Sequence, residues 1–199
     1  METPKRGLIS LWLDSATPTL WIALTQGDRL LVEHQQHGDN DHSKTLMPLL
    51  ERLMREASLT VKDLHDITVG VGPGSYTGTR IGVVVAKTLA YALNIPLYKV
   101  SSLALLASSQ EGTSIAAVDA RRGYVFAGKY HRQENTLSLL EADAYTTLDT
   151  LQTTPPLAVV IEGTPHVLSV KSLRERVLDL DALAPTYLRL TQAENEYGH

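Results

Sequence analysis

The chain has 199 residues, of which 43% are hydrophobic and 20% are charged, values that are ordinary for a globular protein large enough to bury its own core. It contains no cysteine, which excludes thiol nucleophiles, disulfides and cysteine-ligated zinc or iron–sulfur centres, and its net charge of −4 argues against unaided binding of nucleic acid. No apolar run approaches the roughly 20 residues of a membrane span and no secretory signal follows Met1, so we expect a cytoplasmic protein without a membrane segment.

The first part of the chain predicts a three-strand meander. Strands are expected at residues 8–13, 19–24 and 29–33, with turns at Thr17-Pro18 and Gly27-Asp28. A polar connector then leads to a helix that starts near Ser43. The apolar face of this helix recurs at three- and four-residue spacing and consists of Leu46, Leu49, Leu50, Leu53, Met54 and Ala57.

Strands and helices alternate after this point. A strand is expected at residues 66–71, a helix from about 77 to 93 and a strand at 96–100. A meander followed by such alternation is typical of the ribonuclease-H-like half of an actin-like ATPase lobe, whereas a Rossmann unit alternates from its start. The predicted fold class is therefore α/β, with the two-lobed actin-like ATPase (ASKHA) architecture.

The second half of the chain is less regular and predicts a smaller lobe. We place the boundary so that residues 1–101 form the N-terminal ribonuclease-H-like lobe and residues 102–199 form the C-terminal lobe. The elements expected in the second lobe are a short helix at 102–106, strands at 115–120 and 124–130 around a turn, a short helix at 147–151, a strand at 157–161, a helix at 173–178 and a closing segment at 185–189.

A glycine-rich segment lies where a predicted strand meets a predicted helix. Such a junction can cradle a phosphate, because glycines allow close approach and a helix N-terminus offers free N–H groups. A P-loop requires a second glycine five residues after the first, then Lys-Ser/Thr, whereas Gly74 and Gly78 are four residues apart and Thr79-Arg80 follows. The dinucleotide pattern fails as well, because Gly78 comes one residue late after Gly72 and Gly74. A tight connection is therefore the favoured interpretation, and a phosphate loop stays open as the lesser one.

The two helices of the first lobe offer a surface for another chain. Small residues recur every four positions on the second helix at Gly82, Ala86 and Ala90, which allows close packing. Packing inside the fold explains this pattern equally well, so both interpretations stay open. The candidate partner-binding residues are Leu46, Met47, Leu50, Met54, Ile81, Gly82, Val85, Ala86 and Leu89.

Residues 72–82, which read GPGSYTGTRIG, resemble the segment GPGSFTGLRIG of the TsaB (YeaZ) family. Further ordered matches are His42-Ser43, the stretches 94–97, 100–103 and 118–121, and Pro185-x-Tyr187-Leu188-Arg189, so the resemblance spans most of the chain. The residues that form the signature loop are Gly72, Pro73, Gly74, Ser75, Tyr76, Thr77, Gly78 and Arg80.

The resemblance implies a role in making threonylcarbamoyladenosine in tRNA, at the adenosine next to the anticodon. It implies a non-catalytic scaffold that binds the paralogous transferase TsaD as a heterodimer and meets the ATPase TsaE through the complex. Self-association as a dimer and only indirect contact with tRNA are further expectations.

The residues matched to catalytic positions of related ATPases are incomplete. Asp14-Ser15-Ala16 keeps the hairpin aspartate but resembles the family's DTS only partly, and His42 stands without the second histidine of the metal-binding paralogue. We therefore expect no catalytic residue, no metal and no cofactor, with weak or interface-only binding of ATP and Mg²⁺ left open. The alternative functions are a degenerate actin-like kinase or ATPase that uses Asp14 and the segment 72–79, and, less favoured, a glycoprotease-like hydrolase.

Other clusters of polar residues have ordinary structural explanations. His34, His37 and His42 could bind a metal with Asp39 and Asp41, but a solvated connector is the favoured interpretation. Ser75 and Ser101 lack the G-x-S-x-G elbow of a serine nucleophile and are expected to cap helices. Asp119, which precedes Ala120-Arg121, is expected to stabilise a turn.

Overall fold

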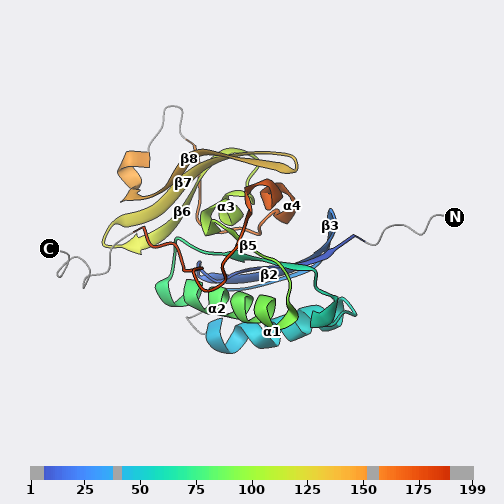
Figure 1. The fold of residues 1–199 in the computed structure, drawn as a ribbon. Coiled ribbons are helices and arrows are strands. Elements are labelled where there is room, and N and C mark those ends of the chain that lie inside the picture. The colour runs from blue at the N-terminus through green and yellow to red at the C-terminus, as the bar shows by residue number, and fades with distance from the viewer. Residues whose placement is uncertain (1–6, 38–41, 152–156, 189–199) are drawn as a thin grey trace, which may run out of the picture.

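The structure of the chain is a computed structural model that describes residues 7–37, 42–151 and 157–188. Two sheets carry the fold, one above the other in Figure 1. The first has six strands in the order β10-β5-β4-β1-β2-β3, and the second has four in the order β8-β7-β6-β9. Helices α1 and α2 cover the outer face of the first sheet, whereas α3 and α4 lie between the two sheets (Figure 1).

The first sheet follows the predicted order of elements. β1 (Ile9–Asp14), β2 (Thr19–Gln26) and β3 (Arg29–His37) form an antiparallel meander, and β4 (Asp66–Gly70) and β5 (Leu97–Val100) extend it in parallel from β1. Parallel strands need crossovers, which α1 (His42–Glu56), a short 3-10 turn (Val61–Asp63) and α2 (Tyr76–Leu93) provide. The actin-like, ribonuclease-H-like fold class is thus confirmed in its first half.

The second sheet holds the irregular part of the chain. Its strands are β6 (Gly112–Arg121), β7 (Tyr124–Gln133), β8 (Thr136–Thr147) and β9 (Ala158–Val160). α3 (Ser102–Ala107) precedes it, a 3-10 turn (Leu148–Leu151) follows β8, and α4 (Val167–Val170) follows β9. The division at residue 101 stays a prediction, since β10 (Glu175–Arg176) returns to pair with β5 in the first sheet.

Two expectations for the second half are wrong or incomplete. β8 was not predicted, because its adjacent Leu139 and Leu140, both about half exposed, break the alternation that marks a strand. Residues 173–178 do not form a helix. They contain the end of a 3-10 turn (Lys171–Leu173) and then β10, because Arg174 and the neighbouring backbone bind the first sheet.

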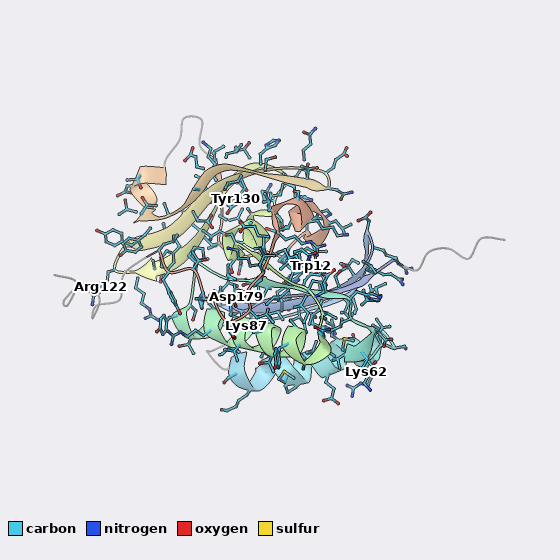
Figure 2. All side chains as sticks on the ribbon, viewed as in Figure 1. Trp12, Lys62, Lys87, Arg122, Tyr130 and Asp179 are labelled. Carbon is cyan, nitrogen blue, oxygen red and sulfur yellow. The ribbon has the colours of Figure 1, made fainter. Side chains whose placement is uncertain are left out.

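Separate apolar clusters fill the two layers. One lies between the first sheet and helices α1 and α2, with Leu11, Leu53 and Ile67 completely buried. The other lies between the sheets and joins Trp12 to α3 and to Tyr130 of β7 (Figure 2). The opposite faces of β1 therefore serve different cores, because successive side chains of a strand point to opposite sides.

The segment after α4 runs back over the first lobe. Arg174 binds Asp66 at 3.1 Å and stacks over the ring of Tyr98. The ammonium of Lys87 on α2 donates to the carbonyl oxygens of Asp181 and Leu183, and Figure 2 shows Lys87 beside this segment. The C-terminal segment thus connects the second sheet to the flank of α2.

Candidate functional site

The turn between β1 and β2 carries the aspartate that an actin-like ATPase would use. In this chain Asp14 is only 4% exposed. Its Oδ1 accepts hydrogen bonds from the hydroxyl of Ser102 at 2.7 Å and from the N–H of Ala16 at 3.3 Å. Burial raises the pKa of Asp14 against the opposing effect of these hydrogen bonds. The carboxylate is thus turned inward and held by the chain itself.

Three glycines of the signature segment bring α2 against this turn. A β carbon on Gly74 would lie closer than 3.0 Å to the carbonyl oxygen of Ala16, and one on Gly78 would lie closer than 3.0 Å to the carbonyl oxygen of Ser15. Both distances are too short, because real β carbons essentially never come within 3.0 Å of such an atom. A β carbon on Gly82 would lie 2.5 Å from the hydroxyl of Ser15. Gly74 and Gly78 are therefore required by close packing of backbone against backbone, and Gly82 by the Ser15 side chain.

Hydrogen bonds fix the same contact. The N–H of Ser75 donates to the carbonyl oxygen of Ala16 at 2.7 Å. The hydroxyl of Ser15 donates to the carbonyl oxygen of Gly78 at 2.7 Å. The hydroxyl of Ser75 caps α2 by accepting from the N–H of Gly78. Chain atoms thus fill the space between the hairpin turn and the helix N-terminus, which a phosphate loop would leave for its ligand.

Arg80 joins two parts of the signature that are distant in sequence. Its guanidinium carbon lies 3.9 Å from the centroid of the Tyr76 ring, and its Nε donates to the hydroxyl of Tyr187 at 2.8 Å. The rings of Tyr76 and Tyr187 are 5.2 Å apart. The hydrogen bond to Tyr187 raises the pKa of Arg80. Arg80 therefore fastens the C-terminal segment onto the start of α2.

The candidate partner-binding residues divide by exposure. Leu46, Leu50 and Met54 of α1 are at most 5% exposed, and Gly82 and Ala86 of α2 are also buried. Those five belong to the packing of this chain, although Leu50 and Met54 also line the floor of an apolar groove beside Met47. The partly buried residues Ile81, Val85 and Leu89 pack against the first core.

The exposed apolar surface of α1 and α2 is formed largely by side chains other than these buried ones. Met47 is 48% exposed, and on α2 Val84 is 59% and Tyr91 80% exposed. The candidate partner-binding residues expected from the sequence did not include Val84 or Tyr91. Their spacing of seven residues, two helical turns, could have indicated one exposed apolar face.

The three histidines of the connector region bind separate partners. The Nε2 of His34 lies 2.8 Å from Glu56, the Nδ1 of His37 lies 3.0 Å from the hydroxyl of Thr19, and the Nε2 of His42 lies 3.2 Å from the carbonyl oxygen of Thr17. Asp39 and Asp41 lie outside the described residues. Within the described ranges no three histidine or acidic side chains are grouped as a metal would require.

Ser101 and Asp119 have structural roles. The hydroxyl of Ser101 caps α3 by accepting from the N–H groups of Leu103 and Ala104, as a capping serine does. Oδ1 of Asp119 accepts from the N–H of Arg121 in the β6–β7 turn, where Arg121 and Arg122 both have positive φ.

These features define an actin-like, two-lobed protein whose hairpin aspartate and glycine-rich loop are packed against each other. Residues 34–194 match the family model described as TsaD, tRNA N6-adenosine threonylcarbamoyltransferase. The chain is 31% identical to the tRNA threonylcarbamoyladenosine biosynthesis protein TsaB of Bacillus subtilis, over 94% of this chain and 96% of that protein. It is 32% identical to Escherichia coli TsaB over 63% of this chain and 56% of that protein.

Solved structures agree with these relatives. A Pseudomonas aeruginosa protein described as similar to peptidase YeaZ superposes with a TM-score of 0.77 at 28% identity, covering 92% of this chain and all of that one. The YeaZ structure from the same species gives a TM-score of 0.76 at 25% identity, over 91% of this chain. The chain therefore belongs to the TsaB (YeaZ) family, within the group of TsaD-like domains. In the parts that the structure describes, no helix is long and apolar enough to cross a membrane.

Proposed function

We propose that this chain is a non-catalytic subunit that binds and supports a TsaD-type transferase while threonylcarbamoyladenosine is made in tRNA. The observation that carries the proposal is the packed turn at Asp14, where Ser102 hydrogen-bonds the carboxylate and the glycine-rich loop lies against the backbone of Ser15 and Ala16. A metal ion requires several convergent ligands, and Asp14 is buried with its Oδ1 already bound by Ser102 and Ala16. This arrangement supports the proposal that the chain does not act as an ATPase by itself.

The partner is a chain of related fold. This protein matches the family model of the transferase over most of its length, so the two chains share the helices that cover the first sheet. We place the contact on the outer surface of α1 and α2, where Met47, Val84 and Tyr91 are exposed. Self-association through the same surface would compete with the heterodimer, the ATPase TsaE would be met through the complex, and tRNA would be contacted only indirectly. The proposed location is the cytoplasm.

Reconstitution tests this function directly. Purified transferase, TsaE, a synthase of threonylcarbamoyl-adenylate and tRNA are incubated with and without this chain, and the modified nucleoside is measured by mass spectrometry. We expect turnover only when the chain is present, and none from the chain alone. Full-rate modification without the chain would refute the proposal.

A degenerate kinase or ATPase is the second candidate, because Asp14 is retained at the hairpin. We expect calorimetric titration of the isolated chain with Mg-ATP to give no tight binding, since Asp14 points into the core. Micromolar binding to the isolated chain that disappears in Asp14→Asn, with folding retained by circular dichroism, would favour the kinase. Binding that appears only after the transferase is added would mean that nucleotide binds at an interface.

A further inference from the structure

A cavity of about 260 Å³ lies where both lobes meet the C-terminal segment. Its wall comes from the ends of β4 and β5, the start of α3, the strands β7 and β8, and residues of the segment 173–186. Asp14 and the hairpin turn do not line it, so it is separate from the packed turn described above.

Asp143 of β8 lines this cavity, and both of its carboxylate oxygens accept hydrogen bonds from neighbouring side chains. Its Oδ1 accepts a hydrogen bond from the hydroxyl of Tyr130 at 2.5 Å, and its Oδ2 accepts one from the hydroxyl of Ser101. Tyr130 is only 2% exposed, so its ring cannot move freely. Gly128 leaves room for the carboxylate, because a β carbon there would overlap Oδ1 of Asp143. Residues of β7 and the N-cap of α3 thus orient one carboxylate of β8.

The charge of this carboxylate has no cationic partner among the described residues. Its two donors are neutral hydroxyls, and Lys99 at the cavity wall forms its ion pair with Glu175 at 3.1 Å. Burial raises the pKa of Asp143, because removal from water disfavours an ionised carboxyl group. A cation placed in the cavity would supply the missing counter-charge.

The rest of the wall selects the kind of cation. Val71, Val100, Leu139 and Leu173 make much of the cavity apolar, which suits a short aliphatic body. A divalent metal is a poor fit, since Ca²⁺ needs about six to eight oxygen ligands, whereas the cavity wall offers the carboxylates of Asp143 and Glu175, and Glu175 is paired with Lys99. The hydroxyl oxygen of Tyr130 also keeps acceptor capacity for an N–H donor.

We propose that this cavity binds a small organic ammonium ion with a short aliphatic body, and that Asp143 is its counter-ion. Simple amines and free α-amino acids share this chemistry. They differ in the carboxylate of the amino acid, which would compete with Glu175 for Lys99 at the cavity wall. The site does not depend on the role proposed for α1 and α2, so either inference can fail alone.

Calorimetric titration of the full chain with four matched probes tests the site. The probes are n-butylammonium, norvaline, n-butanol and butyrate, which vary the charge on one aliphatic chain. We expect butylammonium, norvaline or both to bind. We expect the neutral n-butanol and the anionic butyrate to bind at least about tenfold more weakly than the tighter of the two ammonium probes. Tighter binding of norvaline would identify amino acids as the ligand class, and tighter binding of butylammonium would identify simple amines.

Variants separate the carboxylate from general packing. Asp143→Asn should weaken ammonium binding at least about tenfold. The control is Asp119→Asn, which changes an exposed aspartate on β6, two strands away in the same sheet, and should leave binding unchanged. If Asp143→Asn does not fold, Leu139→Trp tests the site by filling the cavity from a half-exposed position, and should abolish binding. Equal binding of n-butanol, unchanged affinity in folded Asp143→Asn, or no binding of either ammonium probe would overturn the proposal.

Discussion

Gly78→Ala is expected to lower the free energy of unfolding by about 3 kcal/mol or more, enough to unfold much of the protein at ordinary temperature. The added methyl would overlap the carbonyl oxygen of Ser15, which is backbone and cannot rotate away. Relief would require α2 to move from the hairpin turn. That movement would break the hydrogen bonds from Ser75 to Ala16 and from Ser15 to Gly78.

Urea denaturation followed by circular dichroism measures this effect. The control is Thr77→Ala, which introduces alanine one residue earlier in the same helical turn, where the side chain is exposed. We expect the control to change stability by no more than about 0.5 kcal/mol. If Gly78→Ala were as stable as Thr77→Ala, the glycine would not be required by packing, and an open loop able to accept a ligand would become the better interpretation.

Local patterns were sufficient for the first half of the fold. The meander ends in recognisable turns, and the apolar spacing of α1 and α2 matches a helix that covers a sheet. The order of the elements along the chain and the positions of the helices therefore followed from local patterns. The same spacing identified Leu46, Leu50 and Met54. It could not decide whether they face this chain's core or another chain, because both surfaces are apolar.

The second half depends on contacts between residues far apart in sequence. β8 is held by pairing with β7, although its adjacent Leu139 and Leu140 are about half exposed. Residues 173–178 contain good helix formers, yet Arg174 is used to bind Asp66, 108 residues away. Asp143 carried no sequence signal for the same reason, because its partner Ser101 lies 42 residues earlier. No local pattern encodes such pairs.

The glycine-rich signature gains a physical explanation from the structure. Its spacing argued against a phosphate loop without saying what the glycines do. Gly74 and Gly78 allow α2 to touch the hairpin turn, and Arg80 fastens the C-terminal segment to the same helix. The signature thus sets the position of α2 on the first sheet, and with it the outer surface of the helix that we assign to the partner.

Charge substitution on that surface should weaken complex formation without unfolding the protein. Val84→Glu places a carboxylate at a position that is 59% exposed in the isolated chain and is proposed to be desolvated against the transferase. An unpaired buried charge is costly, so we expect the dissociation constant of the heterodimer to rise at least about 100-fold, or roughly 2.7 kcal/mol. Met47→Glu, which is 48% exposed on α1, should act in the same direction.

Two comparisons make this test specific. Ile161→Glu introduces the same charge at a 67% exposed apolar residue beyond β9, on the second lobe, and should leave affinity unchanged. Leu50→Glu is unsuitable because Leu50 is only 3% exposed, and a charge there would disrupt the core. Affinity is measured by biolayer interferometry with immobilised transferase, and folding of each variant by its thermal midpoint. If Val84→Glu and Met47→Glu both bound normally while Ile161→Glu did not, the partner would dock on the second lobe, and α1 and α2 would serve only the packing of this chain.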